Sequence, residues 1–312
     1  MSTETVTPAA RPVQPPDSSA ARPPGQGRAA TGFLLPFALL YLAFILGPAV
    51  YGLIMSFFDA SLVRPGLGGF AGFGNYTEAL QSADFWSSLW HTLWFTILTT
   101  PPLIVLAFVF ALLADRVSRG RWFFRLAFFA PFILPSAVVA LIWIFMYTPE
   151  LGLLEVGLAK IGITAPAWLG DATWAMPSLA VTTIWWTLGF NFILYLAGLQ
   201  EIPRDLYEAS AIDGAGPWQQ IRRITIPMLG RTTTLVAVLQ VIASLKVFDQ
   251  MYLMTTGGPD FATRSVLQYV YDQGFTNFRL GYAAAVSMLF FLVVLAVSAV
   301  WFTIVRRQEK EV

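Results

Sequence analysis

Residues 201–231 read EIPRDLYEASAIDGAGPWQQIRRITIPMLGR, a polar segment that lies between two long apolar runs. Pro203 suits the first position of a helix, because proline has no N–H to lose there and its φ angle is already helical. Asp205 and Glu208 place negative charge near the N-terminus of this helix, where the helix dipole favours it. The beginning of the segment therefore predicts a short helix outside the apolar runs.

The second half of the segment predicts a turn and a second helix. Gly214 and Gly216 interrupt the first helix, since glycine is favoured where a helix ends and the chain turns. Pro217 can begin a second short helix, and Pro227 is expected to end it. The segment as a whole predicts a helix-turn-helix hairpin between two apolar spans.

The composition of the chain indicates an integral membrane protein. Of the 312 residues, 56% are hydrophobic and 12% are charged, and the mean hydropathy is +0.64. A soluble domain of this length could not keep such a composition in solution. The net charge of +1 argues against a nucleic-acid partner, because such binding needs a clustered basic surface. We therefore expect a chain surrounded by membrane lipid.

Metal and thiol chemistry find little support in the sequence. The chain has no cysteine, which excludes a disulfide, a thiolate nucleophile and a cysteine-ligated metal. The single histidine, His91, lies between Trp90 and Trp94 at the start of an apolar run and makes a poor metal site by itself. We expect no metal site.

Six apolar stretches reach the ~20 residues that a helix needs to cross a bilayer. They predict an all-α protein with spans at 33–57, 89–113, 123–147, 176–198, 235–254 and 282–305. Residues 1–30 are rich in Pro, Ala, Ser and Arg and are expected to form a disordered cytoplasmic tail, which leaves residues 31–312 as the membrane domain. Prolines fall inside several spans, where we expect kinks: Pro48, Pro101, Pro102, Pro131 and Pro135.

Basic residues predict the orientation of the spans. Of the 19 Lys and Arg residues, 14 fall in the tail, in the loop after the second span, in residues 201–231 and at the C-terminus. Four fall in the opposite loops, and Lys246 falls within a span. By the positive-inside rule, both termini and residues 201–231 are cytoplasmic.

Nucleotide-driven transport needs a phosphate-binding loop, which the sequence lacks. A P-loop requires lysine directly after glycine at the end of a glycine-rich turn. The three lysines are Lys160, Lys246 and Lys310, and none of them follows glycine. Any ATP hydrolysis that drives this chain is therefore expected on another subunit.

The hairpin segment resembles the cytoplasmic coupling loop of binding-protein-dependent ABC importer permeases. The resemblance rests on Glu-Ala-Ser at 208–210, Asp-Gly-Ala at 213–215 and Ile-x-Ile-Pro ending at 227. It implies a permease fold of six spans whose loop docks in a cleft of an ATPase subunit. The residues that it assigns to this coupling are Glu208, Ala209, Ser210, Asp213, Gly214, Ala215 and Pro227.

The same resemblance implies a set of partners. These are a second, homologous permease, a dimer of the ATPase and an extracytoplasmic sugar-binding protein. ATP and Mg²⁺ would be bound by the ATPase, and this chain would have neither a cofactor nor a catalytic residue.

Three further segments resemble carbohydrate-importing permeases, including the larger maltose-type subunit: residues 70–76 (FAGFGNY), 245–260 (LKVFDQMYLMTTGGPD) and 280–285 (LGYAAA). They imply import of a sugar or oligosaccharide. Positions that grip the sugar in the maltose-type family match Gly189, Phe192, Gln240, Ser244 and Val247, and Asn191 adds an amide on the fourth span. Gln240 and Ser244 can exchange hydrogen bonds with sugar hydroxyls without the desolvation cost of a charge. Packing between helices would also explain both residues.

Two other readings stay open. A permease of the same architecture for glycerol phosphate or a polyol would look nearly the same in sequence. Lys246 and Asp249, three residues apart, can face each other if they share one helix. They would then form a structural pair, or they would serve a secondary transporter that needs no ATPase.

Overall fold

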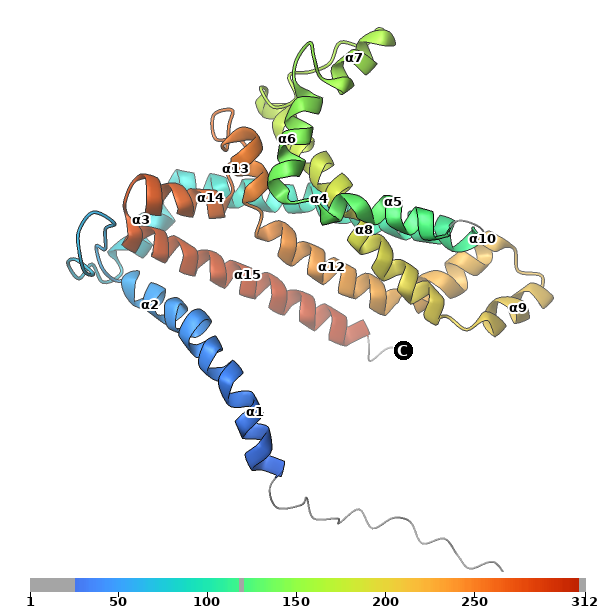
Figure 1. Cartoon of the computed structure of the whole chain (residues 1–312), viewed down its shortest axis with the longest axis horizontal. Helices are drawn as coiled ribbons and strands as arrows, with labels where there is room; N and C mark the ends of the chain where they lie inside the picture. The colour runs from blue at the N-terminus through green and yellow to red at the C-terminus, as the bar shows by residue number, and fades with distance from the viewer. Residues whose placement is uncertain (1–25, 118–120, 309–312) are drawn as a thin grey trace, which may run out of the picture. The chain divides into compact units, whose positions relative to one another are not determined.

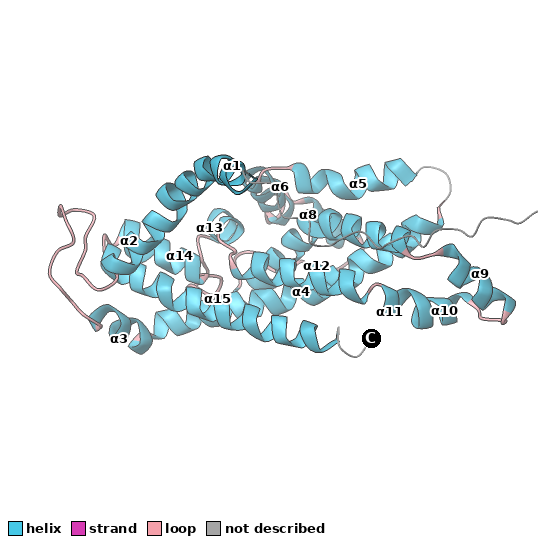
Figure 2. Cartoon of the chain, turned by 90° about the horizontal axis from the view of Figure 1, so that it is seen from below, coloured by secondary structure: helices cyan, strands magenta, loops and turns pink. Residues whose placement is uncertain are grey.

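The computed structural model describes residues 26–117 and 121–308. These residues form helices joined by turns and loops, with one isolated bridge between Phe58 and Phe70 and no strand (Figure 2). The chain divides into two parts, Met1–Tyr51 and Gly52–Val312. Most of the predicted tail, residues 1–25, lies outside the described residues, whereas its last five residues already belong to a helix that begins at Gln26.

The first part is dominated by one long apolar helix with a widened turn. Helix α1 (Gln26–Tyr41) continues through a π-helical turn, η1 (Leu42–Leu46), into α2 (Gly47–Met55). Pro48 cannot donate a backbone hydrogen bond, and the wide turn just before it lets the N–H of Gly47 reach the carbonyl of Leu42. Phe33–Met55, with a mean hydropathy of 2.2, is long enough to cross a membrane and corresponds to the predicted first span.

Four long helices form the core of the second part (Figure 1): α4 (Ala83–Arg116), α8 (Ala172–Glu201), α12 (Gly230–Leu245) and α15 (Leu280–Gln308). Helix α4 packs against α8 and α12, and α12 also packs against α15. Ala107, Ala111 and Ala114 recur on one face of α4 and are buried against aromatic residues of α8. Small residues at this spacing let helix backbones approach closely inside a membrane.

The predicted third span is bent, and so is the segment that leads into the predicted fifth span. Four helices of the described chain are long and apolar enough to cross a membrane without a break, and two bent pairs raise the number to six if each pair is one span. Helix α5 (Arg121–Ile133) and α6 (Ser136–Tyr147) meet at 97°. Pro135 disfavours a helical conformation for the residue before it, which explains the break and confirms the predicted kink there. Helix α4, in contrast, continues as one helix through Pro101 and Pro102.

Two boundary predictions were wrong. The fifth span does not run from 235 to 254, because α12 ends at Leu245 and a separate short helix, α13 (Asp249–Thr255), follows after a break. Pro227 does not end a helix either. A π-helical turn, η2 (Ile221–Thr225), precedes Pro227. The wider turn accommodates a proline that cannot donate a backbone hydrogen bond, so Pro227 lies inside α11 (Ile226–Met228). The chain then bends by 62° into α12.

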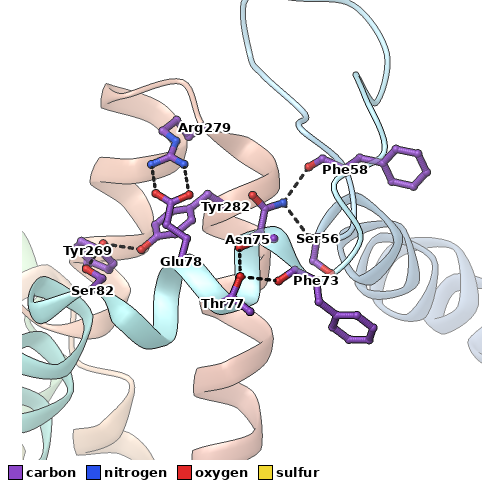
Figure 3. Close-up of polar contacts among 11 residues, drawn as sticks. Ser56, Phe58, Phe73, Asn75, Thr77, Glu78, Ser82, Tyr269, Arg279 and Tyr282 are labelled. Atoms are coloured by element: carbon purple, nitrogen blue, oxygen red, sulfur yellow. Dashed lines mark hydrogen bonds and ion pairs between the residues drawn. The ribbon is translucent and has the colours of Figure 1, made fainter.

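Two short elements, α14 (Val266–Tyr271) and η3 (Asp272–Thr276), lie at the end of the bundle that carries α3 (Gly74–Gln81), whereas α7 (Leu153–Lys160) packs on α6 and projects away from the bundle (Figure 1). In α3, the amide of Asn75 donates to the carbonyl oxygens of Ser56 and Phe58, both at 3.0 Å (Figure 3). Arg279 forms two parallel hydrogen bonds of 2.7 Å with Glu78, and this pairing raises the pKa of the arginine. These contacts tie the start of α15 to α3, and α3 to the segment that follows α2.

Candidate functional site

The predicted hairpin is present at the end of the bundle opposite to α3 in Figures 1 and 2. Helix α9 (Arg204–Ile212) leads into a turn and then into α10 (Pro217–Gln220). Pro217 occupies the start of α10 as predicted, and Pro203 lies one position earlier than predicted, as the residue that caps α9. The hairpin therefore begins three residues after α8 ends at Glu201.

The turn of the hairpin depends on one glycine. Gly214 has a φ of +83°, a conformation that costs an L-residue about 1–2 kcal/mol, whereas Gly216 has a φ of −72° that any residue adopts. The N–H of Gly214 donates to the carbonyl of Ala211 at 3.1 Å, and that of Ala215 donates to the carbonyl of Ser210 at 2.9 Å. These bonds satisfy carbonyl groups that the end of α9 would otherwise leave free.

Polar side chains brace the two arms of the hairpin. Ser210 donates to the carbonyl of Tyr207 at 2.9 Å, and the amide of Gln220 donates to the Ser210 hydroxyl at 2.9 Å. The hydroxyls of Tyr207 and Thr225 share a hydrogen bond of 2.9 Å, and Thr225 is buried. Ser210, predicted as a coupling residue, thus holds the hairpin together.

The outer face of the hairpin is exposed and partly apolar. Glu208, Ala209, Asp213 and Pro227 are exposed, as the coupling prediction requires of them, and Ala215 is half-buried. Ile212 and Trp218 are 87% and 73% exposed on either side of the turn. Large apolar side chains in this position are typical of a protein-binding surface. Neither was predicted as a site residue, although an isolated Ile and Trp in a polar hairpin were the available signal.

A cleft of about 180 Å³ opens among α4, α8, α12 and the break that follows α12. Three predicted residues line it: Gln240, Ser244 and Val247. Sequence reasoning missed the residues that α4 and α8 contribute, which are Phe95, Thr183, Trp186 and Thr187. The indole N–H of Trp186 donates at 3.1 Å to the carbonyl of Leu134, at the α5–α6 break. The cleft therefore combines amide, hydroxyl and aromatic groups.

Gln240 has hydrogen-bonding capacity to spare at this cleft. Its amide oxygen accepts from Asn191 at 3.2 Å. Its amide nitrogen makes no hydrogen bond within residues 26–117 and 121–308. Ser244 donates to the carbonyl of Val241 at 3.1 Å and lies 3.5 Å from the Thr100 hydroxyl. An amide with an unused donor is what recognition of a hydroxyl-bearing ligand requires.

The remaining predicted pathway residues lie away from the cleft. Phe192 is fully buried, with its ring 5.1 Å from that of Phe128 on α5. A Cβ atom at Gly189 would collide with the backbone of Phe128, so this glycine lets α5 and α8 approach each other. Asn191 is buried and reaches the cleft only through Gln240. These three residues therefore pack and position α8.

Lys246 and Asp249 do not form the predicted pair on one helix. Lys246 follows the last residue of α12, and Asp249 begins α13. Both side chains are exposed and line the cleft, and the described residues give neither of them an ion pair. The prediction was wrong because it assumed an unbroken fifth helix.

A family model confirms the class to which this fold and hairpin belong. Residues 104–310 match the family described as "Binding-protein-dependent transport system inner membrane component". The chain belongs to this family. It is therefore a multi-pass inner-membrane permease of an ABC importer and not an enzyme, since the ATPase of such a system is a separate subunit.

Individual relatives resemble the chain over most of its length. It is 32% identical over 276 residues to the sulfoquinovosyl glycerol transport system permease protein SmoG of Agrobacterium fabrum, covering 88% of this chain and 90% of that protein. The sn-glycerol-3-phosphate transport system permease protein UgpA of the same organism is 34% identical over 240 residues, covering 77% and 82%.

A solved structure shares the fold. It is the crystal structure of a bacterial alginate ABC transporter in complex with an alginate pentasaccharide-bound periplasmic protein. The TM-score is 0.80 at 26% sequence identity, and the match covers 90% of this chain and 94% of the solved chain. The match confirms the predicted ABC importer permease fold.

Proposed function

We propose that this permease carries a sugar or oligosaccharide through the cleft beside α12. The observation that supports this most is the position of Gln240. It lies on α12 ten residues beyond Gly230, about 15 Å along the helix axis at ~1.5 Å per residue, well inside the bundle. A donor amide beside hydroxyls and an indole suits a ligand rich in hydroxyl groups and with an apolar ring face.

The coupling prediction complements this proposal. The hairpin projects exposed Ile212, Trp218 and Glu208 at the end of the bundle from which α12 begins. We propose that this face docks on the ATPase, which carries ATP and Mg²⁺, and that closure of an ATPase dimer moves α9 and tilts the spans. A second permease would complete the pathway, and an extracytoplasmic sugar-binding protein would deliver the substrate. In support, the solved alginate transporter was captured with its periplasmic protein.

One alternative substrate is favoured by specific observations. The relative UgpA is named for glycerol-3-phosphate, and the exposed Lys246 at the cleft would suit a phosphate group. Asp249 lines the same cleft and opposes an anion, so we place a neutral sugar first. Uptake by a secondary transporter through Lys246 and Asp249 is less well supported, since the family is one of ABC importers.

The proposal is tested by reconstituting the complete transporter with its ATPase, partner permease and binding protein in liposomes. Radiolabelled uptake of a neutral disaccharide and of glycerol-3-phosphate is then compared with and without ATP inside the vesicles. We expect ATP-dependent uptake of the sugar in excess of the phosphate ester. Preferred uptake of glycerol-3-phosphate would support the alternative, and uptake that needs no ATP would contradict both.

A further inference from the structure

A second pocket, of about 440 Å³, lies where the hairpin joins the ends of the spans. Arg125 of α5 and Arg204 of α9 line it from two sides, together with Gln200 at the end of α8. Both arginine side chains are exposed, and in the part of the chain that the structure describes neither forms an ion pair. Two arginine side chains thus line one pocket, and no carboxylate of residues 26–117 or 121–308 is paired with either of them.

The charge of this pocket favours an anion. Among the described residues that line the pocket, Asp115 of α4 is the one acid, and this residue makes an interaction of its own. The two positive charges of the arginines exceed the one negative charge of Asp115. Their planar guanidinium groups can donate paired hydrogen bonds to the oxygen atoms of a phosphate group. The amide of Gln200 adds a neutral donor at the same rim.

Exposed aromatic residues beside Arg125 indicate where the phosphate would come from. Trp122 and Phe123, in the same turn of α5 as Arg125, are 70% and 57% exposed. Exposed aromatic residues beside arginines, at the ends of apolar helices, are typical of the level of the lipid headgroups. Basic pockets between spans on the cytoplasmic side bind anionic headgroups by this combination.

We propose that this pocket binds the phosphate group of an anionic phospholipid, which fastens the hairpin to the ends of α5 and α8. Arg204 is the first residue of α9, so a ligand held by both arginines would bridge the coupling helix and a span. With the lipid bound, motion of the hairpin would be transmitted to α5 and α8 more rigidly than without it. The effect on transport rests on the coupling role proposed for the hairpin, whereas binding of the lipid does not.

The experiment uses the complete transporter in nanodiscs of phosphatidylcholine with or without phosphatidylglycerol. Retained phosphatidylglycerol is measured by native mass spectrometry, and stimulation of the ATPase by loaded binding protein is measured in parallel. We expect the wild-type protein to retain the anionic lipid and to be stimulated more strongly in its presence. Because each basic residue contributes about fivefold to such binding, Arg125→Gln with Arg204→Gln should reduce retention by about 25-fold.

Two variants serve as controls. Arg222→Gln with Arg223→Gln removes two exposed arginines of the same hairpin that line a different pocket, and it should leave retention unchanged. Arg125→Lys with Arg204→Lys keeps the charge but loses the planar guanidinium groups, so it should retain more lipid than the Arg-to-Gln variant and less than the wild-type protein, which separates recognition from misfolding. Equal retention by the Arg-to-Gln variant of the pocket and by the wild-type protein would overturn the proposal.

Inorganic phosphate distinguishes the two sources of the ligand. Added alone to phosphatidylcholine nanodiscs, it should not reproduce the stimulation by phosphatidylglycerol. Equal stimulation by phosphate would overturn the lipid assignment and show a site for free phosphate. ATP-driven sugar uptake that is normal in liposomes with and without phosphatidylglycerol, together with no phosphatidylglycerol retained in the nanodiscs, would refute this inference and leave the proposed function intact.

Discussion

At the scale of single residues, Gln240 and Ser244 either bind a substrate in the cleft or only pack α12 against its neighbours. Both are buried between α12 and its neighbours, yet both line the cleft, and the Gln240 amide keeps an unused donor. A residue needed only for packing would be expected to use its hydrogen-bonding groups within the protein. The arrangement therefore favours a role in recognition.

Gln240→Leu combined with Ser244→Ala should raise the KM for uptake several-fold and leave the maximal rate nearly unchanged. Each lost hydrogen bond to a buried hydroxyl is worth on the order of 1 kcal/mol. Thr99→Val is a matched control, because Thr99 is a buried hydroxyl residue of α4 that does not line the cleft. Asn191 loses its acceptor in the double variant, so protein abundance is measured as well. A loss of uptake that is independent of substrate concentration, with poor assembly, would show that the two residues only pack helices.

At the scale of elements, the hairpin offers two glycines that differ in one property. A Cβ atom at either Gly214 or Gly216 would meet open space, but only Gly214 has a positive φ. Gly214→Ala should therefore strain the turn by about 1–2 kcal/mol and lower the ATPase stimulation by loaded binding protein, whereas Gly216→Ala should behave like the wild-type protein. Equal ATPase stimulation in both variants would show that the conformation of this turn plays no part in coupling.

The contact between α5 and α8 provides a second test among elements. Gly189→Ala should lower the amount of assembled protein, because the added methyl group collides with the backbone of Phe128 and the two helices must separate. Gly230→Ala, which places a methyl group in open space at the start of α12, is the control. Assembly and thermal stability in detergent are measured by size-exclusion chromatography. Normal assembly of Gly189→Ala with a selective defect in uptake would show that Gly189 belongs to the substrate pathway.

At the scale of the whole molecule, the open question is the orientation of the permease in the membrane. The distribution of basic residues predicts cytoplasmic termini and a cytoplasmic hairpin. The absence of cysteine makes labelling direct, since one introduced thiol is the only one. A cysteine at Gln219 in the hairpin should resist a membrane-impermeant maleimide applied to intact cells, and a cysteine at Gln81 in α3 should react. The reverse pattern would invert the orientation and with it the proposed coupling.

Much of this architecture could be predicted because local sequence is sufficient for it. Runs of about 20 apolar residues cross a bilayer as helices, since lipid offers the backbone no other partner. The hairpin followed from Pro217 and the glycines, whose backbone preferences act within a few residues. The break at Pro135 followed for the same reason. These features need no knowledge of neighbouring helices.

Apart from the local errors at Pro203 and Pro227, the features that the sequence did not reveal depend on contacts between distant residues. Apolar periodicity continues past Leu245, so the sequence alone favours one helix through Lys246 and Asp249, whereas the fold ends α12 and turns both charges toward the cleft. The family resemblance assigns Phe192 and Gly189 to the substrate pathway, and only the fold shows that both lie against Phe128, more than 60 residues away along the chain. Trp186 joins the cleft because the α5–α6 break offers it a carbonyl oxygen.

The sequence determined the membrane class, the hairpin and most spans, because these are set by local hydrophobicity and backbone preference. Only the tertiary structure decided which polar residues share a cleft, because burial and hydrogen bonding between helices arise only once the helices are packed.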